Sequence, residues 1–120
     1  VLDTLYNGKH LAIVDSSIEA HMLDLLIYRE SARMSQSKGD YEYQICGKSC
    51  LAGDIFGEFR FANELKPGDR LSIDDAGGYT MVKKNWFNGV KMPSIAVKHL
   101  DGSTELVREF DYKDFLENLS

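Results

Sequence analysis

Residues 41–61 read YEYQICGKSCLAGDIFGEFRF, and this stretch decides the class of fold. Apolar and polar residues alternate over 41–47, and they alternate again through Ile55, Gly57, Phe59 and Phe61. A period of two residues is typical of strands that bury one face. Between the two expected strands lies the loop Gly47–Asp54, which carries Cys50 near its centre.

Further short strands punctuated by turns are expected on both sides of this stretch. They are predicted over residues 10–15, 70–74, 79–87, 95–99 and 104–108. Pro67-Gly68-Asp69 forms a turn before the expected strand over 70–74. Asn88-Gly89 supplies a two-residue hairpin turn, because both central residues of such a turn need a positive φ. Asp101-Gly102 repeats that device. About seven strands at this spacing predict an all-β fold, as a barrel or sandwich.

Two segments carry a helical pattern. Apolar residues recur with a period near 3.6 over 17–28, although a compact loop is the alternative there. Asp111 is positioned to cap a short helix over 112–119. The polar stretch 31–40 is expected to be an exposed loop. The prediction is one mainly β domain over residues 1–120, with one or two short helices.

The composition narrows the class of function. The 120 residues include 14 basic and 19 acidic side chains, which gives a net charge of −5. A negative charge disfavours binding to nucleic acids and to anionic membrane surfaces. No apolar run approaches the roughly 18 residues of a membrane span. We therefore expect a soluble, cytoplasmic protein with no nucleic-acid or membrane partner.

Metal and disulfide chemistry are not expected. The two cysteines, Cys46 and Cys50, are too few for a disulfide framework, and their spacing lacks the second pair of ligands that a zinc site needs. His10, His21 and His99 are scattered along the chain. The sequence therefore predicts no metal site.

Three residues are candidates for a functional site, each with an ordinary structural alternative. Cys50 lies on a glycine-containing loop that can expose its thiol, but free cysteines are also often buried. Asp15 ends an apolar strand, where it can meet a ligand or simply form a turn with the serines after it. Tyr79 follows Gly77-Gly78, so its phenol can donate to an oxyanion, or it is only a strand tyrosine. Cys46 is expected in the core, and His21 and Arg29 are expected to be solvated or capping residues.

Several strings of residues, taken in order, resemble a known family. They are SCLAGD at 49–54, LKPGD at 65–69, DAGGYTMVK at 75–83 and FNG at 87–89. They resemble the C-terminal domain of the carboxynorspermidine and carboxyspermidine decarboxylases. This branch belongs to the pyridoxal-phosphate decarboxylases with an alanine-racemase-like fold, together with the ornithine and diaminopimelate decarboxylases. The resemblance covers nearly the whole chain.

The resemblance implies a two-domain enzyme of polyamine biosynthesis, of which residues 1–120 are the C-terminal β-barrel domain. The N-terminal (β/α)8 barrel, with the Schiff-base lysine for pyridoxal 5′-phosphate, would lie outside this chain. The family forms head-to-tail homodimers with active sites at the interface. By position, Cys50 would be the catalytic proton donor, Tyr79 would bind the cofactor phosphate, and Asp15 would bind the distal amino groups of a carboxypolyamine substrate. Asp54 would be a structural or interface residue, and the isolated domain would be inactive.

Some residues depart from the family pattern. Lys48-Ser49 stand where Pro-Thr is usual, Gly77-Gly78 where Ala-His is usual, and Glu30 where proline often follows Arg29. These changes bear on cofactor affinity and substrate preference more than on the fold. The alternative function is a free-standing β-barrel binding module. That alternative requires the conspicuous residues Asp15, Cys50 and Tyr79 to converge in a pocket within one chain.

Overall fold

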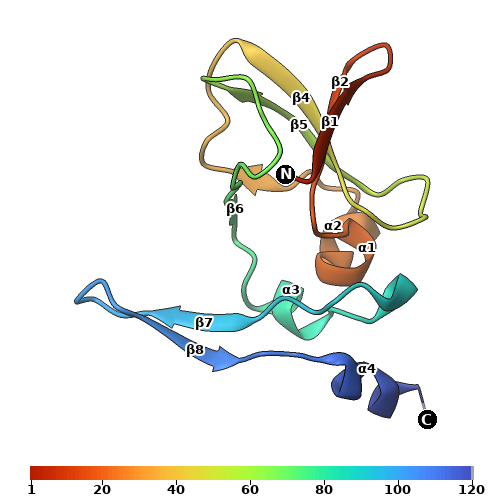
Figure 1. Ribbon diagram of the computed structural model, residues 1–120, viewed down its shortest axis with the longest axis vertical. Coiled ribbons are helices and arrows are strands. Elements are labelled where there is room, and N and C mark those ends of the chain that lie inside the picture. Colours follow the sequence, from red (N-terminus) through yellow and green to blue (C-terminus); the bar gives the residue numbers. More distant parts are fainter. Residues whose placement is uncertain (120) are drawn as a thin grey trace.

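A four-stranded sheet is the largest element of the computed structural model, which describes residues 1–119 (Figure 1). The strands lie in the order β1-β2-β4-β5, with β1 at Asp3–Tyr6, β2 at His10–Ile13, β4 at Tyr41–Cys46 and β5 at Ile55–Phe61. The β1–β2 and β4–β5 pairs are antiparallel, and β2 pairs with β4 in parallel. Three expected strands are confirmed, and β1 is one that the sequence pattern did not predict.

The connection from β2 to β4 crosses over, as a parallel pair requires. It contains helix α1 (Ile18–His21), helix α2 (Leu23–Tyr28) and the short strand β3 (Arg33–Met34). The helical interpretation of 17–28 is therefore confirmed. The expected exposed loop over 31–40 is wrong at β3, because this strand pairs with β6 (Ile73–Asp74) and buries Met34.

The core is one cluster of apolar side chains from the sheet, from α1 and from β3. Its buried members are Ala12, Val14, Ile18, Met22, Ala32, Met34, Tyr43, Ile45, Phe56, Phe59, Phe61 and Leu65. Leu25 and Leu26 of α2 are partly buried against this cluster, so both helices pack with the sheet and fix the segment that follows Asp15.

A β-bulge changes the buried face of β5. The ladder pairs Ile45 with Gly57 and then Cys46 with Ile55, so Phe56 is the extra residue on its strand. Phe56 is fully buried, whereas Ile55 is exposed. The predicted alternation holds through Phe59 and Phe61 but is wrong at Ile55, because one inserted residue reverses which side chains face the core.

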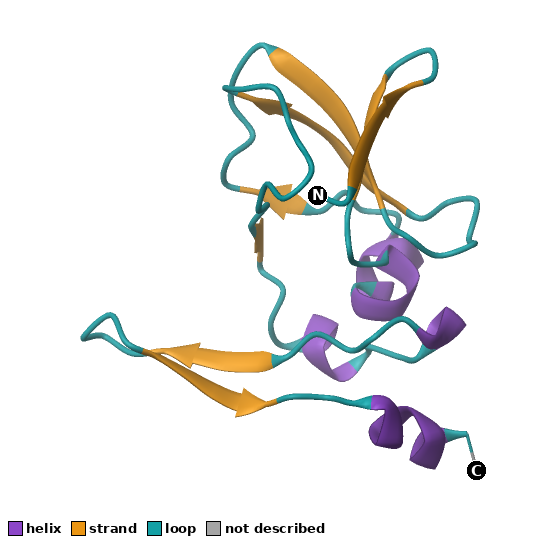
Figure 2. Ribbon diagram, in the orientation of Figure 1, coloured by secondary structure: helices purple, strands orange, loops and turns teal. Residues whose placement is uncertain are grey.

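The last part of the chain forms a separate group of short elements (Figure 2). They are α3 (Tyr79–Val82), the 3-10 turn η1 (Phe87–Gly89), β7 (Ile95–Lys98), β8 (Thr104–Arg108) and α4 (Tyr112–Asn118). Strands β7 and β8 form the expected hairpin around Asp101-Gly102. The predicted cap of α4 is also confirmed, since the Asp111 carboxylate accepts from the backbone N–H of Lys113 and of Asp114.

The expected strand over 79–87 is wrong, because residues there form hydrogen bonds with the helical segment instead of pairing with a neighbouring strand. The backbone N–H of Asn85 donates to Ala20 at 2.8 Å, and its side-chain amide donates to the Glu19 carbonyl at 3.0 Å. Asn88 and Gly89 do have the positive φ values that were expected, 56° and 65°. They turn within η1 rather than between two strands.

The described residues do not form a closed barrel. They form one four-stranded sheet and two separate two-stranded sheets, β3-β6 and β7-β8. The expected strand over 70–74 is only two residues long. The mainly β class with a few short helices is confirmed, whereas the barrel or sandwich is not observed, because β6 and the β7–β8 ribbon do not join the ladder of the main sheet.

The molecule is more open than a chain of this length usually is. Its radius of gyration is 15.1 Å, against about 13.6 Å for a compact domain of this size. It exposes 8137 Å², where a compact monomer of this mass exposes about 6,600 Å². In Figure 1 the β7–β8 ribbon and α4 lie below the helices, away from the main sheet. None of the helices described is long and apolar enough to span a membrane.

Candidate functional site

The loop Gly47–Asp54 is held by one buried carboxylate. Asp54 is 4% exposed, and its Oδ1 accepts from the Ile18 backbone N–H at 2.7 Å. Its Oδ2 accepts from the backbone N–H of Ser49 at 3.1 Å and also from the Ser49 hydroxyl. Asp54 thus joins Ser49 and the last residue of the loop to the first turn of α1, and the expected structural role of Asp54 is confirmed.

Gly47 is required at the base of this loop. A Cβ built on Gly47 would lie 2.2 Å from Asp54 Oδ1, which is far inside van der Waals contact. The absence of a side chain at this position lets the carboxylate reach Ile18 and Ser49. The backbone closes the same junction, since the N–H of Gly47 donates to the Asp54 carbonyl at 2.8 Å.

Cys50 lies at the exposed end of the loop, and its thiol is free. The structure therefore favours the exposed alternative for this cysteine over the core one. Cys46, in β4, is only partly buried, and burial raises the pKa of its thiol. A thiol that is partly buried in a strand is less accessible to an external substrate than one on an open loop, so Cys46 is the poorer candidate for chemistry.

Asp15 lies directly after β2 and is exposed. It borders a cavity of about 470 Å³ whose lining is mixed: Val14, Met34 and Ile45 are apolar, whereas Asp69 and Arg70 are charged. The next residue, Ser16, accepts from the Lys48 backbone N–H at 2.9 Å. This bond joins the segment of Asp15 to the loop of Cys50.

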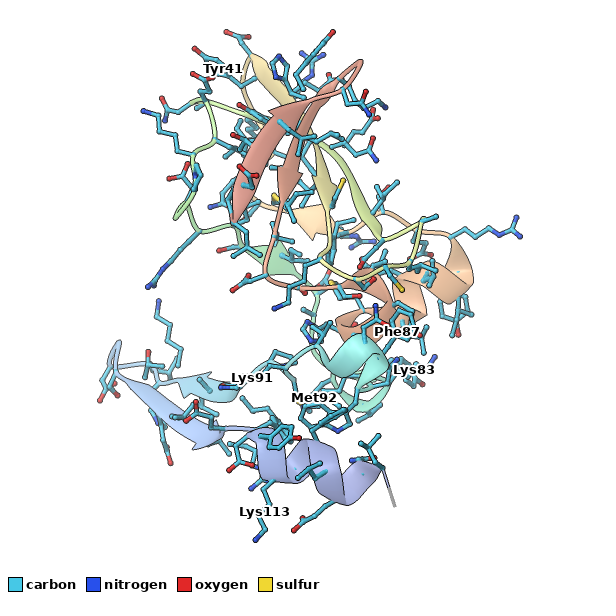
Figure 3. The ribbon with its side chains drawn as sticks, turned by 45° about the vertical axis from the view of Figure 1, so that its right-hand side comes forward. Tyr41, Lys83, Phe87, Lys91, Met92 and Lys113 are labelled. Carbon is cyan, nitrogen blue, oxygen red and sulfur yellow. The ribbon has the colours of Figure 1, made fainter. Side chains whose placement is uncertain are left out.

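His21 connects α1 to the C-terminal part of the chain. Its Nε2 lies 2.8 Å from the Lys91 carbonyl, on the segment that leads from η1 into β7 (Figure 3). Because a carbonyl only accepts, Nε2 carries the proton and Nδ1 accepts from the Ser16 hydroxyl at 2.8 Å. Burial lowers the pKa of His21, which favours this neutral form. The expectation of a solvated residue is wrong here, because the ring is 8% exposed.

Tyr79 begins α3 and points its ring into solvent, with 76% of the residue exposed. Gly78 before it has φ 56° and ψ −119°, a conformation that is costly for residues with a side chain. Thr80 after it is buried, and its hydroxyl donates to Asp24 Oδ2 at 2.8 Å. The phenol is therefore presented outward by a turn that is anchored to α2.

A lysine ammonium lies beside this phenol. The Nζ of Lys83 is 5.3 Å from the ring centroid of Tyr79 and 5.3 Å from that of Tyr28, at the end of α2. Both are cation–π distances. The position of Lys83 is labelled in Figure 3.

The three predicted site residues are attached to one support but do not share one pocket. The Asp15 and Cys50 segments meet through Ser16 and Lys48, and the Tyr79 turn joins α2 through Thr80. The cavity that Asp15 borders is lined by neither of the other two. All three are exposed, so the arrangement suits contact with another body of protein more than an internal ligand pocket. No cluster of three or more metal-ligating side chains occurs within residues 1–119.

Sequence reasoning missed the anchors of these residues. The pairs Thr80–Asp24 and His21–Lys91 join positions 56 and 70 residues apart, and no local pattern signals them. Lys83 was also missed, although its spacing of four residues from Tyr79 on a helical turn is a usable signal.

Comparisons with known proteins identify relatives of this fold and site. The family described as "Pyridoxal-dependent decarboxylase, C-terminal sheet domain" matches residues 1–77. A carboxynorspermidine/carboxyspermidine decarboxylase of Herminiimonas arsenicoxydans is 67% identical over all 120 residues, which are 33% of its length. A carboxyaminopropylagmatine decarboxylase of Synechocystis is 44% identical over 90% of this chain and 29% of its own.

A solved structure agrees with these sequences. Carboxynorspermidine decarboxylase of Campylobacter jejuni, complexed with norspermidine, matches 98% of this chain and 36% of its own with a TM-score of 0.91 and 33% identity. The chain therefore spans about a third of the length of the relatives it matches, and its elements are arranged as they are in that structure.

Proposed function

The chain belongs to the pyridoxal-dependent decarboxylase family, and on that premise we propose that it is the C-terminal part of an enzyme that releases CO₂ from carboxynorspermidine, carboxyspermidine or both. The products would be norspermidine and spermidine, in polyamine biosynthesis. The observation that carries this proposal is the 67% identity over the entire chain to a decarboxylase with this name. A cytoplasmic location stays a prediction.

The residues present fit the phosphate of pyridoxal 5′-phosphate. The Tyr79 phenol is exposed and can donate a hydrogen bond, and the Lys83 ammonium lies against its ring. A neutral donor beside a positive charge suits a phosphate. When bound, the cofactor would supply an electron sink for the bond that breaks as CO₂ leaves. The lysine that holds it would lie in the (β/α)8 barrel outside this chain.

Cys50 is proposed as the proton donor. Its Sγ–H would give a proton to the substrate carbon that has lost CO₂, and the resulting thiolate would take up a proton from solvent before the next turnover. A thiol suits this role because its ordinary pKa lies within reach of neutral pH. The anchoring of the loop by Asp54 supports the proposal, since a proton donor must be held in position.

Asp15 is proposed to bind the distal amino group of the substrate. A polyamine carries several positive charges, so a carboxylate at the end of a rigid strand can attract and orient it. The net charge of −5 acts in the same direction. Nothing in the described residues selects one carboxypolyamine over another.

The proposed partners are the barrel domain of the same polypeptide and a second subunit. The chain exposes roughly 1,500 Å² more than a compact monomer of its mass, about twice the roughly 800 Å² that each partner buries in a standard protein interface. The exposure of the three site residues also supports such partners, because none of the three is enclosed in a pocket of this chain. The domain by itself should be inactive. The alternative of a free-standing binding module is less well supported, because Asp15, Cys50 and Tyr79 do not line one cavity.

The test uses the full-length protein that contains this segment. Variants Cys50→Ala and, as a matched control, Cys46→Ala are assayed for CO₂ release from carboxynorspermidine and carboxyspermidine, with product analysis. Loss of a positioned acid lowers turnover by about a hundredfold or more, so Cys50→Ala should lose turnover while it still binds pyridoxal phosphate. The control should keep most of its turnover. Equal rates and products for Cys50→Ala and the parent protein would exclude Cys50 as the proton donor.

A further inference from the structure

The ammonium of Lys83 contacts two tyrosine rings, one of them the exposed ring of Tyr79. Its Nζ lies 5.3 Å from each of the ring centroids of Tyr79 and Tyr28. Tyr79 and Lys83 are four residues apart on one helical turn, and the Lys83 backbone N–H donates to the Tyr79 carbonyl at 3.0 Å. The side chain is partly buried, so the two rings restrict where its charge can lie.

The positive charge of Lys83 is not neutralised by a carboxylate. Several other lysines pair with acidic side chains, namely Lys9 with Glu58, Lys91 with Glu109 and Lys113 with Glu117. Within residues 1–119, Lys83 takes part in no such ion pair. A cation that rests on two aromatic faces keeps its charge available to an external anion.

Neither of the two acidic residues that precede α3 or bond to it forms an ion pair with Lys83. Asp75 pairs with Arg33 at 3.0 Å, and Asp24 accepts from the Thr80 hydroxyl through Oδ2, whereas its Oδ1 is buried and has no hydrogen-bond partner among the described residues. Lys84, the next residue, directs its ammonium elsewhere, to 4.1 Å from the ring centroid of Phe110. Of the two adjacent lysines, only Lys83 thus lies against the exposed phenol.

We propose that Lys83 supplies the positive charge of an anion site whose hydrogen-bond donor is the Tyr79 phenol, and that the anion is the cofactor phosphate. The inference rests on the proposed function, and it adds a second phosphate-binding residue to it. Tyr28 takes part indirectly, because its ring also contacts the Lys83 ammonium. A phosphate carries nearly two negative charges at neutral pH, so a neutral phenol alone leaves most of that charge without a partner.

The test measures cofactor binding by the full-length apoprotein and does not depend on turnover. Variants Lys83→Met, Lys83→Gln, Lys83→Arg and Tyr79→Phe are titrated with pyridoxal 5′-phosphate and with pyridoxal, which lacks the phosphate, by protein fluorescence. Lys84→Met is the matched control, since it removes the same charge from the adjacent position and a different aromatic contact.

We expect Lys83→Met and Lys83→Gln to raise the Kd for pyridoxal phosphate about five- to twentyfold, the effect of one charge several ångströms from a dianion near solvent. Their Kd for pyridoxal should stay within about twofold of the parent value. Lys83→Arg should restore binding of pyridoxal phosphate to within about threefold, because a guanidinium also rests on aromatic faces. The Kd of Lys83→Met should respond less to added salt than that of the parent protein.

The outcomes separate this inference from the proposed function. If Tyr79→Phe weakens binding of pyridoxal phosphate and Lys83→Met does not, Lys83 has no part in the site although the proposed function stands. Equal losses for pyridoxal and its phosphate in Lys83→Met would show a merely structural role and also overturn the inference. A parent protein that binds no pyridoxal phosphate would overturn both proposals.

Discussion

Replacement of Asp54 by alanine tests whether this carboxylate holds the Cys50 loop in place. The change removes the acceptor of three hydrogen bonds, one from Ile18 and two from Ser49. The N–H of Ile18 is buried and would be left without a partner, at a cost of about 1–3 kcal/mol. The bonds from Ser49 matter less, because that residue is partly exposed and water can replace the carboxylate. Together the loss is about 3–5 kcal/mol.

The assay is hydrogen exchange of the full-length protein, read at the amides of Ile18 and Ser49. Since about 1.4 kcal/mol corresponds to a factor of ten, these amides should exchange between about a hundred and several thousand times faster in Asp54→Ala. Asp54→Asn should have a smaller effect, because its amide oxygen can still accept from Ile18 while its NH₂ faces the Ser49 N–H. CO₂ release should fall with the loop order, and binding of pyridoxal phosphate should not.

Asp101→Ala is the matched control for this experiment. Asp101 also accepts from the backbone N–H and the hydroxyl of one serine, Ser103, at 2.8 and 2.6 Å, but it does so on the exposed β7–β8 turn. Its removal should leave exchange in residues 47–54 unchanged. If the amides of Ile18 and Ser49 exchange less than about threefold faster in Asp54→Ala, then Asp54 does not hold the loop and the reasoning fails.

Two further predictions concern the supports of the other site residues. Gly78→Ala places a side chain at φ 56°, ψ −119°, which costs about 1–3 kcal/mol, so the Kd for pyridoxal phosphate should rise several-fold. Gly77→Ala is the control, because the φ of Gly77 is not positive, and it should leave this Kd unchanged. Equal Kd values for the two variants would contradict the prediction. Burial lowers the pKa of His21 in the folded protein. Below the ordinary histidine pKa of about 6.5 the unfolded chain therefore binds more protons than the folded one. The free energy of unfolding should fall as the pH drops from 7.5 to 5.5. Urea titrations should show a smaller fall in His21→Gln, and a parental slope in that variant would exclude His21 as the source of the pH dependence.

Elements with strong local patterns could be predicted from the sequence. The alternation in β4, the Asp-Gly turn between β7 and β8, and the aspartate cap of α4 each depend on residues that are close together in the chain. The exposure of Cys50 also follows from local composition, since its loop offers glycines at both ends. These features have little competition from distant contacts, so local propensity decides them.

Contacts between distant residues decided the positions where prediction was wrong. Residues 79–87 have strand-like composition, yet Asn85 bonds to α1 and Thr80 bonds to α2, so the chain turns there. The bulge at Phe56 depends on the register of β5 against β4, which a single strand does not encode. Closure into a barrel was likewise inferred from the number of strands, whereas the ladders of β3-β6 and β7-β8 stay separate from the main sheet.

The three candidate residues share one arrangement, which connects the fold to the proposed function. Cys50, Asp15 and Tyr79 are exposed, and each lies near a residue that is buried and hydrogen-bonded: Asp54, Ser17 and Thr80 respectively. An exposed side chain alone has many rotamers and a poorly defined position. A neighbour bonded to α1 or α2 fixes the backbone on which the exposed side chain stands. All three anchors end on the same pair of helices, so these helices hold the three side chains in a constant relation to one another. Such a surface can act on a substrate when the barrel domain or a second subunit brings the cofactor and substrate against it. The proposed decarboxylase requires this arrangement.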